Sequence, residues 1–175
     1  MRGGSLRSWL RDRTGALHDR LDHAMSRLDL STRDGLGDFL LSHAYGLGAV
    51  QKGAQAFAAR HLSLGMANYL SLVQADLRAL GIRPDIMEPA IGRDTGHDDA
   101  GPDDTDHDRI GAGGCYVLLG SRLGMGVLRQ RGYWRGAAFA HSAYMEDRSE
   151  GRAWTDLLDW MDGGGNAGDE GRDAV

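Results

Sequence analysis

The sequence is poor in residues that crosslink a chain or interrupt its helices sharply. Its 175 residues include 1 cysteine and 3 prolines, and no apolar run reaches the roughly 18–20 residues that a membrane-spanning helix needs. One cysteine excludes an intramolecular disulfide, and the apolar neighbours of Cys115 are typical of a small core residue. The N-terminal stretch lacks the apolar core and the cleavage site of a secretory signal. We therefore expect a cytoplasmic protein without a membrane segment.

Concentrated positive charge is absent as well. The formal net charge is −5 at pH 7, and the cations are spread along the chain. Nucleic-acid binding needs a cationic surface that contacts phosphates, so we expect no nucleic-acid partner. With 41% hydrophobic residues, the chain can bury the core of one domain of ordinary size.

Apolar residues recur at intervals of three and four, the spacing of amphipathic helices. A first helix is indicated by four leucines at this spacing: Leu6, Leu10, Leu17 and Leu21. A second is expected over 31–59 with Ser31 as its N-cap, and a third over 66–80 that ends at Gly81 and Pro84.

The second half of the chain continues this pattern. Helical segments are expected over 114–131, 136–147 and 150–163, and no segment alternates as a strand does. The sequence therefore predicts an all-α fold with one helical domain over 1–163.

Two segments have too few apolar residues to be buried. We expect residues 91–113 to form an acidic loop and residues 164–175 a disordered tail. The aspartates of the loop, with His97 and His107, match neither a calcium loop nor a zinc-site spacing, so we expect a solvated connection there.

The first helix carries a polar stripe beside its leucines. The stripe consists of Arg7, Arg11, Thr14, His18 and Asp22, at steps of four, three, four and four. Asp22 lies one turn beyond His18, where it can accept a proton from one ring nitrogen and leave the other free for a metal. Arg11 can pair with an acidic group of a ligand. Taken alone, such a stripe is typical of an exposed charged face.

The remaining histidines have no spacing that selects them as ligands. We interpret His23, His43, His61 and His141 as surface histidines or as histidines with an internal hydrogen-bond partner.

The helix predicted over 114–131 contains Gly120, Gly124 and Gly126. Each glycine in a helix interior costs roughly 0.5–1 kcal/mol relative to alanine, so something other than helix stability must favour it. Gly120 and Gly124 are four residues apart and share a face. That face can bring bare backbone against a flat ligand that a histidine holds from the other side.

Two sequence motifs carry a resemblance to a known family. "LRDRTGALHDRLD" resembles the proximal helix of the heme oxygenases, particularly of short bacterial members, and "YVLLGSRLGMGVL" resembles their glycine-containing distal helix. The motifs come in the right order, about 100 residues apart, and the resemblance extends from Leu6 to about Met161. It implies a heme-oxygenase-like helical bundle.

The resemblance also implies roles for individual residues. His18 takes the position of the heme-iron ligand, and Arg11 that of a basic residue which meets a heme propionate. Gly120 and Gly124 take the positions where the distal backbone approaches iron-bound oxygen. Ser121 stands where animal members have an aspartate that orders water.

Further residues are expected to line the heme pocket beside these. They are Thr14 and Asp22 on the first helix, and Tyr116 and Met125 on the glycine helix. Arg129 and Arg131 complement the dipole at the end of that helix, and a propionate contact is the alternative for them.

The activity implied is that of a monooxygenase which converts heme to biliverdin, CO and ferrous iron. The implied partners are O2, a ferredoxin or flavin reductase that supplies electrons, and a bilin-binding photoreceptor as one recipient of the product.

Two departures from the family pattern leave alternatives open. Leu119 stands where bacterial relatives frequently have a glutamate, and Met125 replaces the second glycine of a pair. These changes motivate a second hypothesis, a non-catalytic relative that binds heme, a bilin or a protein partner. A third is a helical interaction domain whose tryptophans pack in its core or interface: Trp9, Trp134, Trp154 and Trp160.

Overall fold

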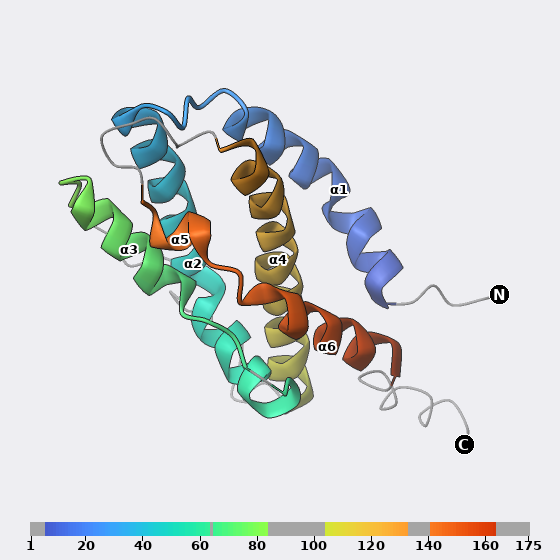
Figure 1. Ribbon diagram of the computed structural model, residues 1–175. Helices are drawn as coiled ribbons and strands as arrows, with labels where there is room; N and C mark the ends of the chain where they lie inside the picture. The colour runs from blue at the N-terminus through green and yellow to red at the C-terminus, as the bar shows by residue number, and fades with distance from the viewer. Residues whose placement is uncertain (1–5, 64, 84–103, 133–140, 164–175) are drawn as a thin grey trace, which may run out of the picture.

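The computed structural model describes residues 6–63, 65–83, 104–132 and 141–163, although for residues 6, 104–109 and 163 only the backbone is described (Figure 1). Within these ranges the chain is helical and contains no strand, which confirms the all-α prediction. The helices are α1 (Leu6–Met25), α2 (Arg33–His61), α3 (Tyr69–Ala79), α4 (Asp104–Arg131), α5 (Ala143–Glu146) and α6 (Glu150–Gly163).

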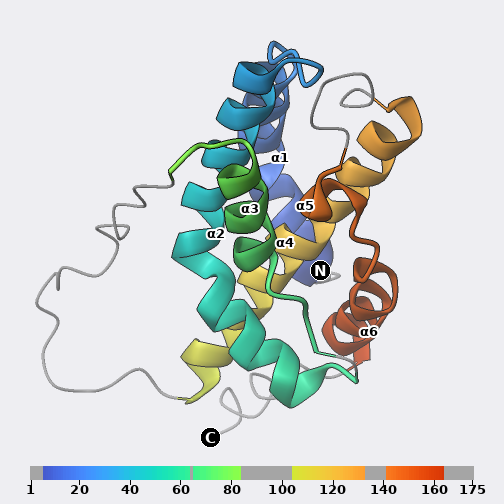
Figure 2. The ribbon, with the colours of Figure 1, turned by 60° about the vertical axis from the view of Figure 1, so that its left-hand side comes forward.

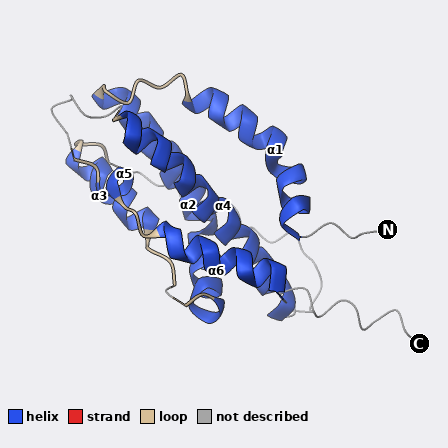
Figure 3. Cartoon of the chain, turned by 45° about the vertical axis from the view of Figure 1, so that its right-hand side comes forward, coloured by secondary structure: helices blue, strands red, loops and turns tan. Residues whose placement is uncertain are grey.

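The long helices α2 and α4 form the centre of the bundle. They share the most extensive helix–helix contact, while α3 and α5 lie side by side on one flank and α1 lies on the other (Figures 2 and 3). Cys115 is fully buried in this contact, where its thiol donates to the carbonyl of Ala54 at 3.1 Å. Burial raises the pKa of the Cys115 thiol to about 12, in agreement with the predicted core role.

The start of α2 corrects the expected cap. Thr32, not Ser31, is the N-cap, and its hydroxyl oxygen accepts from the backbone N–H of Gly35 at 3.1 Å. Ser31 instead donates through its N–H and its hydroxyl to the carboxylate of Asp29. The third helix ends as predicted, because Gly81 adopts a left-handed φ of 68° just after it.

The expected acidic loop is shorter than predicted. Helix α4 begins at Asp104, so residues 104–113 of that segment are helical. The physical reason is packing: Ala112 is buried and Gly111 lies directly against Phe57 of α2. Aspartates at 104 and 106 also favour a helix N-terminus.

Several expectations lie outside the described residues. These are residues 91–103 of the loop, the tail 164–175, Trp134, His97 and the side chain of His107.

Asp76 joins α3 to α5 and thereby positions one wall of the bundle. Its buried carboxylate accepts from the hydroxyl of Ser142 at 2.6 Å and from the backbone N–H groups of Ala143 and Tyr144, each at 2.9 Å. Charge-assisted bonds of this kind are stronger than neutral ones. They fix Tyr144, which is buried next to His43.

Candidate functional site

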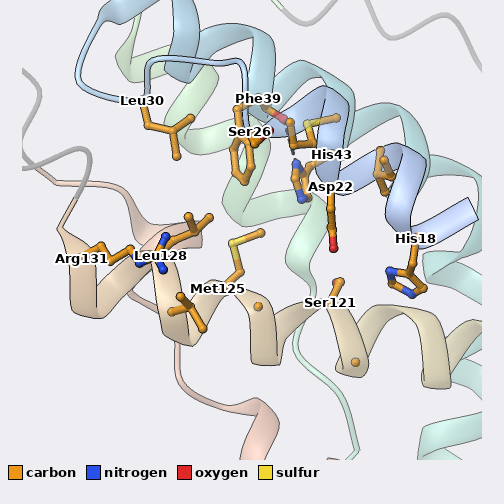
Figure 4. A pocket seen from close by; sticks show the side chains of 15 residues that line it. His18, Asp22, Ser26, Leu30, Phe39, His43, Ser121, Met125, Leu128 and Arg131 are labelled. Carbon is orange, nitrogen blue, oxygen red and sulfur yellow. Dashed lines mark hydrogen bonds between the residues drawn. The ribbon is translucent and has the colours of Figure 1, made fainter. Parts of the chain in front are cut away.

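A cavity of about 500 Å³ lies between α1 and α4 and is closed at the back by α2 (Figure 4). Its wall on α1 and the following turn consists of His18, Leu21, Asp22, Met25, Ser26 and Leu30. Its wall on α4 consists of Gly120, Ser121, Gly124, Met125, Val127, Leu128 and Arg131, and α2 adds Phe39 and His43. Most of this lining is apolar, as in ordinary ligand pockets.

The cavity exists because α1 is held away from the centre of the bundle. The main packing partner of α1 is α6, and its backbone does not approach α4 closely (Figure 1). Two of the leucines predicted on the apolar stripe are therefore open to solvent, with Leu17 61% and Leu21 52% exposed, whereas Leu10 packs against the core. Side chains of this kind lose contact with water when an apolar ligand covers them.

Two of the predicted α1 residues, His18 and Asp22, line the cavity. Both side chains point from α1 toward α4, with Ser121 on the facing helix (Figure 4). In the described part of the chain no hydrogen bond joins them. The expectation that Asp22 orients the His18 ring is therefore not met in this structure, although both lie on the same wall.

The predicted α4 residues Gly120, Ser121, Gly124 and Met125 form the opposite wall. Outside the backbone of its own helix, a Cβ added to Gly124 would meet no atom within 4 Å. At Gly120 it would reach only Trp154, at an ordinary contact distance of 3.6 Å. Neither glycine is therefore required by the packing of the polypeptide.

Three predicted site residues lie outside the cavity lining. Arg11 is exposed on α1, and the Thr14 hydroxyl donates to the carbonyl of Leu10 at 2.9 Å. Tyr116 packs on Trp154, with ring centroids 5.4 Å apart, and does not line the cavity. Spacing placed Tyr116 on the face of Gly120 but could not show that α6 covers this part of the face.

The two departures from the resembled pattern occupy different environments. Leu119 is fully buried in the core and is not part of the cavity wall. Met125 is also buried, yet its side chain forms part of the cavity wall next to Gly124 (Figure 4). Only Met125 therefore changes the shape of the site directly.

His43 lines the cavity, although its spacing in the sequence did not predict this. Its Nδ1 lies 2.8 Å from the carbonyl oxygen of Phe39, and its ring packs against those of Phe39 and Tyr144. Burial lowers the pKa of His43 below its usual value; the hydrogen bond to the Phe39 carbonyl opposes this shift, and the Arg122 charge adds to it. A signal was present, because His43 follows Phe39 by four residues on the apolar face of its helix.

Arg122 was also missed, although it directly follows a predicted site residue. Its side chain is 1% exposed and lies between the rings of Tyr69 and Tyr144, with the guanidinium carbon 5.0 and 4.6 Å from their centroids. Its Nη2 donates to the carbonyls of Tyr144 and Asp147 at 2.9 and 2.8 Å. This places a buried positive charge behind the α4 wall.

Comparison with protein-family models, with curated proteins and with solved structures found no match for this chain. Among the described residues there is also no group of three or more potential metal-binding side chains. Within the same residues, no helix is both long and apolar enough to cross a bilayer. The case for a functional site therefore rests on the geometry of this cavity.

Proposed function

We propose that this protein binds heme in the cavity between α1 and α4 and degrades it oxidatively to biliverdin, CO and ferrous iron. One observation carries the proposal: an imidazole, His18, lines one wall while the bare backbone of Gly120 and Gly124 lines the wall that faces it. A flat ligand coordinated from one side needs this combination.

The chemistry of the lining fits the proposed substrate. A volume of about 500 Å³ lies in the usual range of ligand sites, roughly 300–1,000 Å³. Apolar side chains from three helices can cover the faces of a tetrapyrrole, and the half-exposed Leu21 on α1 would gain burial. Arg131, at the far end of the cavity from His18, offers a cation to a carboxylate of the ligand.

The glycines support a ligand more strongly than a purely structural role. Each costs roughly 0.5–1 kcal/mol in a helix interior. At neither position would an added Cβ clash with a neighbouring side chain or backbone. A ligand that approaches the α4 backbone closely would account for Gly124, where an added Cβ would meet open space, whereas at Gly120 an added Cβ would contact Trp154 of α6.

The roles of the protein residues follow from their positions. Heme, when bound, supplies the iron that reacts with O2 and the ring that is oxidised, with electrons from a ferredoxin or flavin reductase. His18 contributes a ring nitrogen as the ligand, and a neutral imidazole is suited to this role. Gly120 and Gly124 leave space on the other side. Ser121 already donates its hydroxyl hydrogen to the carbonyl of Leu118 at 2.8 Å, so it can offer only lone pairs to water.

Met125 favours one alternative, a protein that binds heme or a bilin without turning it over. Its buried thioether side chain narrows the cavity beside Gly124 and is chemically able to coordinate iron. The same experiment separates this alternative from the enzyme.

The test is a visible absorption titration with hemin of wild type, His18→Ala and the control His23→Ala. His23 is exposed on the same helix and does not line the cavity. We expect saturable one-to-one binding that only His18→Ala weakens, followed by loss of the heme bands and growth of a bilin band on addition of a reductase system under air with catalase.

Each other result selects a different function. Binding without loss of the heme bands would support the non-catalytic alternative. Equal weakening by the two substitutions, or no specific binding, would contradict the heme site and leave a helical interaction domain.

A further inference from the structure

The two serine hydroxyls that line the cavity already donate their hydrogens to backbone carbonyls. The Ser26 hydroxyl donates to the carbonyl of His23 at 2.9 Å, and the Ser121 hydroxyl donates to that of Leu118 at 2.8 Å. The Asp22 carboxylate is an acceptor when ionised. Between His18 and Arg131, at the two ends of the cavity, neither these serines nor an ionised Asp22 has a hydrogen to donate, so a water is the natural donor to a ligand there.

The orientation of His43 decides which of its nitrogens faces that water. The carbonyl oxygen of Phe39 can only accept, so the hydrogen of the neutral ring is on Nδ1, 2.8 Å away. Nε2 then carries a lone pair. The ring enters the cavity from α2, between Phe39 and Asp22 in the view of Figure 4, on the side of Met125.

The groups around His43 favour the neutral ring with its hydrogen on Nδ1. Its ring centroid is 4.2 Å from that of Phe39 and 5.5 Å from that of Tyr144, whose backbone is bonded to Asp76. The charged and titratable groups that line the cavity with it or act on its ring are His18 and Asp22 of α1, Arg122 and Arg131 of α4, and Tyr144 of α5. Burial and the charge of Arg122 both disfavour the protonated ring and lower the pKa of His43.

We propose that His43 is a positioning residue whose Nε2 accepts a hydrogen bond from a water in the cavity and thereby turns the second hydrogen of that water toward the ligand. A neutral imidazole is a stronger base than the Ser121 hydroxyl, so of these two groups His43 is the stronger acceptor for this water. The inference rests on the proposed function for the identity of the ligand, but the state of His43 is testable without any ligand.

The first test is 15N NMR of the imidazole signals in the ligand-free protein, assigned by their loss in His43→Gln. We expect a hydrogen on Nδ1 and none on Nε2 at neutral pH, persisting below pH 6.5, the usual pKa of histidine. A hydrogen on Nε2 at neutral pH would overturn the proposal.

The second test uses carbon monoxide as a probe of hydrogen-bond donors in the hemin-loaded, reduced protein. The C–O stretching frequency is compared in H2O and D2O for wild type, His43→Leu and His43→Gln. In wild type we expect a frequency lowered by a water donor and sensitive to D2O. His43→Leu should raise the frequency and lose the D2O effect, whereas His43→Gln, which keeps an acceptor near the same position, should restore part of both.

The controls separate this inference from the proposed function. A His43→Leu variant with native thermal unfolding and an unchanged frequency and D2O effect would overturn the role of His43. If His43→Leu does not fold, His43→Gln and the NMR signals decide the question. Failure of hemin to bind would contradict the proposed function alone, because the imidazole signals would still report whether Nε2 is a fixed acceptor.

Discussion

The two halves of α4 use glycine in opposite ways. In the first half, a Cβ added to Gly111 would lie 2.6 Å from the Cβ of Phe57 and 3.1 Å from the carbonyl oxygen of Gly53, so glycine permits α2 and α4 to approach closely. In the second half, a Cβ added to Gly124 would lie in open space. The same residue type therefore serves packing in one half and exposes backbone to a cavity in the other.

This difference distinguishes a structural glycine from a candidate ligand-binding one. Both kinds lower helix propensity by the same amount, so helix stability alone cannot separate them. The two kinds differ in how protein stability and ligand affinity respond when a methyl group is added. Substitutions along α4 test this difference directly.

The largest effect is expected at Met125, the buried side chain that partly fills the open half. Met125→Ala should lower the free energy of unfolding by about 2–3 kcal/mol, near the lower end for buried methionine because one side of it faces the cavity. It should also speed CO binding to the reduced heme complex. Urea unfolding and flash photolysis measure the two effects, and unchanged CO rates would show that Met125 does not narrow the site.

Gly111→Ala should disturb the close packing of α2 against the first half of α4. We expect a net loss of about 1–2 kcal/mol, because overpacking costs about 1–3 kcal/mol and the gain in helix propensity returns up to about 1 kcal/mol. Hemin affinity should change little, since Gly111 lies outside the cavity. A neutral or stabilising result in urea unfolding would mean that α2 and α4 are less tightly packed than this geometry requires.

Gly124→Ala should have the opposite sign. The free energy of unfolding should rise by about 0.5–1 kcal/mol, while hemin affinity falls because the methyl group projects into the cavity. Stability from urea unfolding and affinity from hemin titration must move in opposite directions. If affinity is unchanged, the bare backbone at this position does not serve a ligand.

The smallest effect is expected at His43, which lines the cavity from α2. It concerns how the free energy of unfolding depends on pH. Because the pKa of His43 is lower in the folded protein, the unfolded chain takes up a proton near pH 6.5 that the native state does not. This contribution should leave stability constant above about pH 6.5 and reduce it as the pH falls toward the folded pKa. His43→Gln should remove less than about 1 kcal/mol of that loss between pH 7 and pH 5.5, and parallel curves for the two proteins would contradict the shift.

The sequence predicted the parts of the molecule that local patterns control. Apolar spacing located α1, α2 and α3, and α6 covers the predicted range 150–163. In the described part of the expected helix 136–147, only Ala143–Glu146 is helical. The resemblance of two motifs predicted a shared site for His18, Gly120 and Gly124, and all three line the same cavity. The cap of α2 was misplaced by one residue because Ser31 and Thr32 are both able to cap, and the hydrogen bonds of Ser31 to Asp29 decided between them.

What the sequence could not supply were contacts between distant segments. Tyr116 lies on the same helical face as Gly120, but Trp154 covers it. His43 is 78 residues from Ser121, and only the bundle brings both to one cavity. The carboxylate of Asp76, bonded to the start of α5, positions the tyrosine beside His43, and no local pattern indicates that link.

The weak attachment of α1 has a consequence for kinetics. Since α6 is its main packing partner, α1 can separate from the rest of the bundle at a smaller free-energy cost than α2 or α4. A ligand bound between α1 and α4 would join the two helices, so its release and the local unfolding of α1 would become one event. The residence time of the ligand would then be set by the opening of α1, and amide hydrogens of α1 would exchange more slowly as ligand concentration rises.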